Sequence, residues 1–335
     1  MYIEAFSEAR EPARPETNED AFVVLPGRAY AVIDGVTDRN GSRYDGMLAG
    51  RYAARLVASA LERRLPSAIS EVVPTLTRGL RDAYHRHGID LDPTNWGGRM
   101  CCTLALAMQS GDFLDVLLVG DSGIRLNGTN VLQMHKDLDL ITALLRQSAW
   151  HRIIVAVSDP VAREALSRRV AFHGVHQDAA NFDPPLDLAA IGAEAAAACR
   201  AALPNVPGAD IDFLLHHGIV DGQGIFQNRT DSVLGYACLD GLPVPDGLIR
   251  IERFAMSDIQ RIELFTDGYA RPAADFGIAA WEVDFAATER EDPHKTGRFL
   301  SVKGSIPGRW SDDRTYLGVQ FDTDKVRDRA SRHRG

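Results

Sequence analysis

Short apolar segments separated by turn residues constrain the fold of this chain more than any other feature. The segments are rich in β-branched and aromatic residues, and Gly or Asp stands at many of their ends, a pattern typical of strands in a sheet-rich core. They cover residues 21–25, 29–33, 101–108, 113–119, 235–238, 248–254, 261–265 and 316–321. We therefore expect strands to build most of the core.

Helical patterns interrupt the strands. Large apolar residues recur at helical spacing in 46–64, and the pattern continues in 69–85 after Pro66. Residues 137–232 are richer in alanine, and the segment 188–203 is a strong helix former. Strands, then a helix pair, then more strands favour two sheets flanked by helices over alternating βαβ units. We expect an α+β fold with a helical insertion, or flap, at 137–232.

Charge and hydropathy exclude several classes of function. The chain has 37 Lys and Arg against 46 Asp and Glu, a net charge of −9, which argues against general binding to nucleic acid or to an anionic membrane. We find neither an apolar run long enough for a membrane span nor the apolar core of a signal peptide at the charged start. We therefore expect a cytoplasmic protein.

The cysteines carry no recognisable pattern. Cys101, Cys102, Cys199 and Cys238 have no C-x-x-C spacing, so neither a disulfide framework nor a structural zinc site is indicated. We expect the four side chains to be small buried apolar groups.

Acidic residues gather at the ends of the predicted strands. The clusters are Asn18-Glu19-Asp20, Asp34-Gly35, Gly120-Asp121-Ser122, Asp267-Gly268 and Asp312-Asp313. A single Asp-Gly pair is more often a turn than a ligand. Hard divalent cations prefer oxygen ligands, however, and a site for two such cations needs several carboxylates that converge from separate strands. The clusters together therefore indicate a site for Mg²⁺ or Mn²⁺, where two ions share a water and neutralise a phosphoryl group.

The motifs NEDAF (18–22), AVIDGVTD (31–38), VGDSGIRL (119–126), IELFTDGY (262–269) and SDDRTYLGVQF (311–321) resemble, in this order, those of the bacterial PP2C (PPM) family of metal-dependent Ser/Thr protein phosphatases. The resemblance runs from residue 1 to 321 and implies one phosphatase domain over that range. It implies a central antiparallel β-sandwich with helices on both faces, and a variable flap where this chain has residues 137–232. The basic tail 322–335 lies outside it, and we expect the tail to be disordered.

The resemblance also implies roles for individual residues. Asp34 bridges two metal ions, and the Gly35 carbonyl ligates one of them. Asp267 and Asp312 complete the shell of one ion, while Glu19 and Asp20 hold the other, largely through waters. Asp121 would help to bind a third ion, and Asp313 is a candidate for that ion or for a supporting contact.

This chain departs from the family pattern at several positions. Val36 stands where many members have the histidine that protonates the leaving group, and Arg271 replaces a third-metal aspartate. The family's phosphate-binding arginine would fall at Pro15, so the notable alternatives are Arg14, which we favour, and Arg10. A guanidinium suits the role because its fork matches two phosphate oxygens.

Residues next to these motifs admit two interpretations. Asp38 could ligate a metal but is more typical of a turn, and the Thr37 hydroxyl is likewise typical of a turn. The histidine pairs His216-His217 and His173-x-x-His176 could ligate a metal, but adjacent residues on a helix do not easily face one cation. We interpret these histidines as surface or core side chains.

These observations lead to one principal hypothesis. The chain is predicted to hydrolyse phospho-Ser or phospho-Thr on a phosphorylated protein substrate, in signalling, with two Mg²⁺ or Mn²⁺ ions and a metal-bridging hydroxide. Two alternatives stay open: a regulatory or binding module of the same fold with little turnover, and a phosphatase of a small phosphorylated metabolite. The sequence does not give the oligomeric state.

Overall fold

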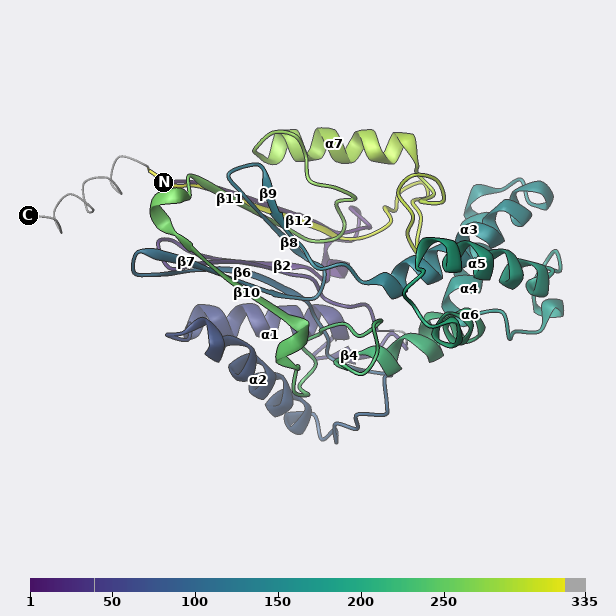
Figure 1. Ribbon diagram of the computed structural model, residues 1–335, viewed down its shortest axis with the longest axis horizontal. Coiled ribbons are helices and arrows are strands. Elements are labelled where there is room, and N and C mark those ends of the chain that lie inside the picture. The colour runs from purple at the N-terminus through teal and green to yellow at the C-terminus, as the bar shows by residue number, and fades with distance from the viewer. Residues whose placement is uncertain (39, 323–335) are drawn as a thin grey trace, which may run out of the picture. The chain divides into compact units, whose positions relative to one another are not determined.

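The computed structural model describes residues 1–38 and 40–322, and within them the chain forms two compact units (Figure 1). The first unit comprises Met1–His135, Ala237–Phe285 and the chain from Asp313 onward. The second comprises Lys136–Tyr236 and Ala286–Asp312. The predicted basic tail falls on 322–335, of which only Asp322 lies within the described residues.

Two five-stranded antiparallel sheets build the first unit. One has the order β1 (Tyr2–Glu8), β12 (Arg314–Gln320), β11 (Arg261–Phe265), β8 (Gly123–Leu126), β9 (Asn130–Leu132). The other has the order β10 (Ile249–Ala255), β7 (Phe113–Val119), β6 (Leu104–Ser110), β3 (Ala29–Ile33), β2 (Ala21–Leu25). β4 (Arg43–Tyr44) and β5 (Met47–Leu48) pair separately.

Alternation along the strands makes the first unit a layered sandwich. In β6, Leu104, Leu106 and Met108 pack with α1 (Ala49–Arg63) and α2 (Val72–Arg86). Ala105 and Ala107 point the other way and pack with residues of the second sheet. Because successive side chains of a strand face opposite sides, one strand thus serves two cores. Figure 1 shows α1 and α2 covering this sheet.

The outer face of the other sheet is covered by α7 (Ile278–Glu291), which begins in the first unit. Trp281 of α7 is fully buried, with its ring centroid 4.9 Å from that of Tyr316 and 5.0 Å from that of Phe265. Its indole N–H donates to Glu263, which also forms a buried ion pair with Arg125. Helices therefore cover both faces of the sandwich.

The second unit is helical. Its helices are α3 (Asp137–Ala156), α4 (Pro160–His173), α5 (Leu188–Ala202) and α6 (Gly208–Gly222). Leu145, Ile191 and Leu214 are among the residues of their common core. The Arg146 guanidinium is buried in this unit and donates to Glu164.

Short 3-10 helices occur in both units. They are η1 (Pro15–Thr17), η2 (Ile69–Glu71), η3 (Ala179–Asn181), η4 (Gln223–Phe226), η5 (Asp246–Leu248) and η6 (Met256–Asp258).

The predicted α+β class, the antiparallel sandwich and the helical middle of the chain are confirmed. The prediction of a strand at 235–238 is wrong, because Tyr236 makes only an isolated β-bridge with Gln227. The chain passes there from the second unit to the first. The assignment of 1–321 to a single phosphatase domain stays a prediction. No helix of the described residues is long and apolar enough to cross a membrane.

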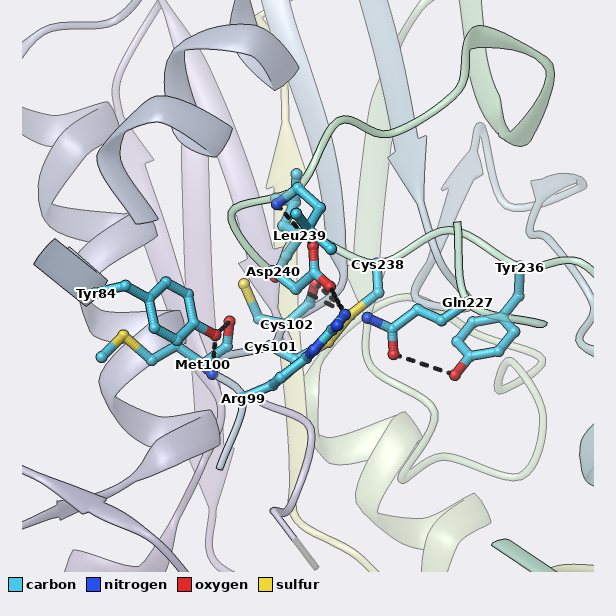
Figure 2. The surroundings of a disulfide bond; sticks show 11 residues. Tyr84, Arg99, Met100, Cys101, Cys102, Gln227, Tyr236, Cys238, Leu239 and Asp240 are labelled. Carbon is cyan, nitrogen blue, oxygen red and sulfur yellow. Dashed lines mark hydrogen bonds and ion pairs between the residues drawn. A yellow bond between two sulfur atoms is a disulfide. The ribbon is translucent and has the colours of Figure 1, made fainter. Parts of the chain in front are cut away.

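A disulfide corrects the interpretation of the cysteines. Cys101 and Cys238, 137 residues apart in sequence, are joined (Figure 2). Cys102 and Cys199 are free and buried. No sequence motif predicts this disulfide, because its cysteines come from two segments that are distant in sequence and become neighbours only in the folded chain. Cys102 and Leu239 exchange backbone hydrogen bonds of 3.0 and 2.9 Å there, which sets the two cysteines side by side.

Candidate metal centre

Three carboxylates converge in the first unit. Asp34 directly follows β3, and one residue separates Asp121 from β7 and Asp267 from β11. Each aspartate therefore lies at the end of a buried strand. One carboxylate oxygen of each lies within 4.8 Å of one oxygen of both others. Like charges at this spacing repel one another, and a cation among them relieves the repulsion.

Backbone contacts fix the direction of Asp34. Its carbonyl accepts from the Thr103 N–H at 2.8 Å, and the Val36 N–H donates to the Cys101 carbonyl at 2.9 Å. Between them, Gly35 lies so close to other backbone that a Cβ there would be 2.5 Å from the carbonyl oxygens of Glu19 and Gly50. The glycine of this Asp-Gly pair is therefore required by crowding rather than by an unusual backbone angle.

The second Asp-Gly pair has the same cause. A Cβ on Gly268 would lie 1.9 Å from the Asp313 carbonyl oxygen. The adjacent backbones are joined by a 3.0 Å hydrogen bond from the Thr266 N–H to the Thr315 carbonyl. The close approach of these two chain segments fixes the position of Asp267 next to the start of β12.

Asp20 is a buried carboxylate beside this cluster. One of its oxygens, Oδ2, accepts from the hydroxyls of Thr266 and Thr315, each at 2.8 Å. Burial raises the pKa of Asp20 well above its usual range, and the carboxylates of Asp313 and Asp267 raise it further. The Oδ1 oxygen has no hydrogen-bond partner among the described residues. A divalent cation would satisfy such an oxygen.

Glu19 is also buried, and Arg10 lies next to it. The Glu19 carboxylate accepts from the Thr37 hydroxyl at 2.6 Å and is 3.8 Å from an Arg10 nitrogen. A second guanidinium nitrogen of Arg10 donates to Thr37 at 3.2 Å. Asp313 accepts from the backbone N–H groups of Arg10 at 2.7 Å and of Glu19 at 3.2 Å. It thereby holds both residues in position.

The arginine favoured from the sequence lies elsewhere. Arg14 has a side chain that is 57% exposed, and its ion-pair partners are Glu11 and Glu16. Arg10, by contrast, is 9% exposed and contacts the acidic residues through Glu19. Counting back from the NED motif missed this, because the chain makes a turn and the short η1 helix between β1 and Asn18.

The remaining candidates take different places. Asp38 accepts backbone N–H groups of Ser42 and Gly98, both at 2.8 Å, as a turn residue does. Arg271 forms a two-bond ion pair with Asp284 of α7. Asp312 belongs to the second unit, where its carboxylate is 2.7 Å from Lys303. Its role as a metal ligand stays a prediction.

Comparison with models of known protein families finds no match, and comparison with curated proteins finds none either. The structure is similar to solved structures of bacterial Ser/Thr phosphatases. One is PstP/Ppp of Mycobacterium tuberculosis, at 14% identity and a TM-score of 0.43 over 96% of this chain and 98% of that one.

Another is Stp1 of Staphylococcus aureus, at 10% identity and a TM-score of 0.44 over 96% and 95% of the two chains. A third is the catalytic domain of PstP in complex with two manganese ions, at 15% identity and a TM-score of 0.44 over 95% and 97%.

Proposed function

We propose that the protein is a Mg²⁺- or Mn²⁺-dependent phosphatase that hydrolyses phospho-Ser or phospho-Thr in proteins. The observation that carries the proposal is the convergence of Asp34, Asp121 and Asp267 from three strand ends to within 4.8 Å. Their donor atoms are all oxygens, which suits hard divalent cations rather than zinc or copper.

The residues fit two such ions. Asp34 is the proposed bridging ligand, and Asp267 and Asp121 lie beside it. The Gly35 carbonyl would ligate one of the two ions. Asp20 and Glu19 would hold an ion through waters, which accounts for a buried Asp20 oxygen with no hydrogen-bond partner among the described residues. When bound, the ions would neutralise phosphoryl charge and make an attacking water more acidic.

The chain's own residues bind and orient the substrate in this proposal. The Arg10 guanidinium would donate to two phosphoryl oxygens. Thr37 orients the guanidinium by accepting one hydrogen bond from it at 3.2 Å, and Asp313 fixes the backbone of Arg10 by accepting from its N–H at 2.7 Å. Val36 supplies no proton to the leaving alkoxide, so that proton must come from solvent. The side chain of Val36 is 42% exposed, which is consistent with access of water there.

The proposal is tested by phosphate release from phospho-Ser and phospho-Thr peptides, with Mn²⁺ and after removal of metal by EDTA. We expect Mn²⁺-dependent turnover that falls at least about 100-fold in Asp34→Asn and Asp267→Asn. Asp82→Asn, an exposed carboxylate on α2, is the matched control and should keep full activity. Metal-independent turnover, or site variants as active as the control, would contradict the proposal.

A binding module with little turnover is the second candidate. It is favoured by Val36, which cannot act as an acid, and by Arg271, whose guanidinium is engaged by Asp284. Calorimetric titration with Mn²⁺ separates the two: ions bound with turnover support the enzyme, and ions bound without turnover support the module. A phosphorylated metabolite as substrate keeps the same chemistry and is tested in the same assay with small phosphate esters.

A further inference from the structure

Three histidines meet in the second unit, outside the acidic cluster. One ring nitrogen of each of His176, His216 and His217 lies within 4.8 Å of one ring nitrogen of both others. The ring centroid of His176 is 5.3 Å from that of His216 and 5.8 Å from that of His217. The ring centroids of His216 and His217 are 4.7 Å apart. The side chains of His176 and His216 are exposed and that of His217 is half-buried, so solvent reaches the group.

Two glycines bring the histidines together. Gly174 directly follows the last residue of α4, and α6 is interrupted at Gly218, which has φ 65° and ψ −158°. A Cβ on Gly174 would lie 2.1 Å from the His216 carbonyl oxygen, and a Cβ on Gly218 would lie 2.5 Å from the Gly174 nitrogen. Only glycines permit this approach, and it sets the segment after α4 against the interrupted turn of α6.

The interruption answers the objection that adjacent histidines on a regular helix do not face one cation. His216 and His217 directly precede Gly218, where the helical angles end. Their ring planes are inclined by 79°, and the third imidazole comes from a separate segment. The Val175 N–H donates to the Leu215 carbonyl at 3.0 Å, which joins the two segments by backbone.

A hydrogen bond prepares His176 as a ligand. Its Nδ1 is 2.7 Å from the His216 carbonyl oxygen. A carbonyl only accepts, so Nδ1 carries the proton and Nε2 of the neutral ring has its lone pair available. Histidines that bind metals in proteins are oriented in the same way, with the second ring nitrogen donating to a carbonyl or carboxylate.

We propose that His176, His216 and His217 form a site for one first-row transition dication of the Zn²⁺ class, distinct from the acidic centre. Imidazole suits Zn²⁺, Ni²⁺ and Cu²⁺ better than Mg²⁺ or Mn²⁺. Three nitrogens about 2.1 Å from a tetrahedral ion are about 3.4 Å apart, and small rotations of these accessible side chains reach that spacing. Water takes the remaining position. The bound ion would tie the segment after α4 to α6.

The test is binding of Zn²⁺ by the full chain, stripped of metal, in a millimolar excess of Mg²⁺ that occupies oxygen ligands. We expect one Zn²⁺ per chain in the wild type and in Asp34→Asn. In His216→Gln and His176→Gln the affinity should fall at least about tenfold, because each loses one of three ligands. His151→Gln, an exposed histidine of α3 beside Glu194, is the matched control and should bind as the wild type does.

The absorption of bound Co²⁺ identifies the ligands independently of affinity. Tetrahedral coordination by imidazole should give visible bands in the wild type and in Asp34→Asn, and these bands should be absent from both histidine variants. Circular dichroism checks that the variants are folded. Because His176 lies outside the helices, His176→Gln still tests the site if His216→Gln perturbs α6. Absence of Zn²⁺ binding in the wild type, or unchanged binding in both variants, would overturn the proposal. Neither result depends on phosphatase activity.

Discussion

Arg10 is the residue whose assignment the structure changes most. It is buried against Thr37 and Glu19, whereas Arg14 is exposed and paired with its neighbours Glu11 and Glu16. A guanidinium that is held in place before the substrate arrives loses little freedom on binding a phosphoryl group. We therefore propose Arg10 rather than Arg14 as the phosphate-binding residue.

Arg10→Ala should lower kcat/KM for a phosphopeptide about 100-fold, because two charge-assisted hydrogen bonds to the phosphoryl group are lost. Arg14→Ala should stay within about twofold of the wild type, since an exposed ion pair contributes little. Steady-state kinetics with Mn²⁺ provides the measurement, and thermal melts check folding. An Arg14 variant that loses as much activity as the Arg10 variant would contradict the assignment.

The buried carboxylate of Asp20 is repelled by the neighbouring carboxylates of Asp313 and Asp267, and a bound metal ion would relieve this repulsion. Burial and the carboxylates of Asp313 and Asp267 raise its pKa, so its charged form destabilises the folded state at neutral pH when no metal is bound. Asp20→Asn should therefore stabilise the metal-free protein, because the amide carries no charge. Its amide oxygen can still accept from Thr266 and Thr315.

Melting temperatures with and without Mn²⁺ measure this effect. Mn²⁺ should raise the melting temperature of the wild type and raise that of Asp20→Asn less. In the absence of metal, the wild type should gain stability as the pH falls through the raised pKa of Asp20, because the folded state then takes up a proton that the unfolded chain does not. A metal-free Asp20→Asn protein that melts below the wild type would show that repulsion is not the dominant effect.

The turn at Asp34-Gly35, which follows β3, is packed tightly against the backbone of other segments. Gly35→Ala should destabilise the protein by more than about 2 kcal/mol, because its Cβ would meet backbone atoms of Glu19 and Gly50 that cannot yield. Gly79→Ala, in the middle of α2, is a control of opposite sign. Its Cβ meets only Leu56 at 3.6 Å, so helix propensity should make it stabilising by up to about 1 kcal/mol.

Denaturant unfolding of both variants gives the measurement, and Mn²⁺ titration of Gly35→Ala adds a second result. A shift of Gly35 displaces Asp34, so the affinity for Mn²⁺ should fall as well. Equal stabilities for the two alanine variants would show that the backbones move apart without cost.

The sequence predicts the elements that repeat a pattern and misses those that do not. The segment 29–33 is a strand with the predicted bounds, because both of its faces are buried and its apolar run is continuous. The segment 113–119 also has the predicted bounds, although Asp115, which pairs with Arg253, interrupts its apolar run. β9 has only three residues, and α7 shows no clear apolar stripe. α7 is anchored instead by Trp281, whose indole N–H donates to Glu263 of the buried Arg125–Glu263 ion pair. Such contacts between distant residues leave no periodic signal.

The carboxylate cluster was predictable for the same reason. Asp34, Asp121 and Asp267 each follow an apolar strand, and strand ends of one sandwich can meet. The choice between Arg10 and Arg14 was not predictable, because it depends on the path of the chain between β1 and β2. The disulfide was not predictable either, since the path between its cysteines includes the whole segment Lys136–Tyr236 of the second unit.

That disulfide closes the longest covalent loop of the molecule and makes its stability sensitive to reducing agents. Cys101 and Cys238 are 137 residues apart, and a loop of this length restricts the unfolded chain strongly, so reduction should cost about 2–5 kcal/mol of stability. Alkylation in denaturant followed by mass spectrometry should find two thiols before reduction and four after it, since Cys102 and Cys199 are free but buried in the folded protein.

Unfolding in denaturant with and without a phosphine reductant provides the measurement. The double variant Cys101→Ala/Cys238→Ala should unfold as the reduced wild type does and should not respond to the reductant, whereas Cys199→Ala should keep the full response. The Cys101 carbonyl accepts from the Val36 N–H, so loss of the bond should also weaken Mn²⁺ binding next to Asp34. If four thiols react without reduction, the bond is not present in the protein. If two react but reduction leaves the unfolding transition unchanged, the loop contributes nothing to stability.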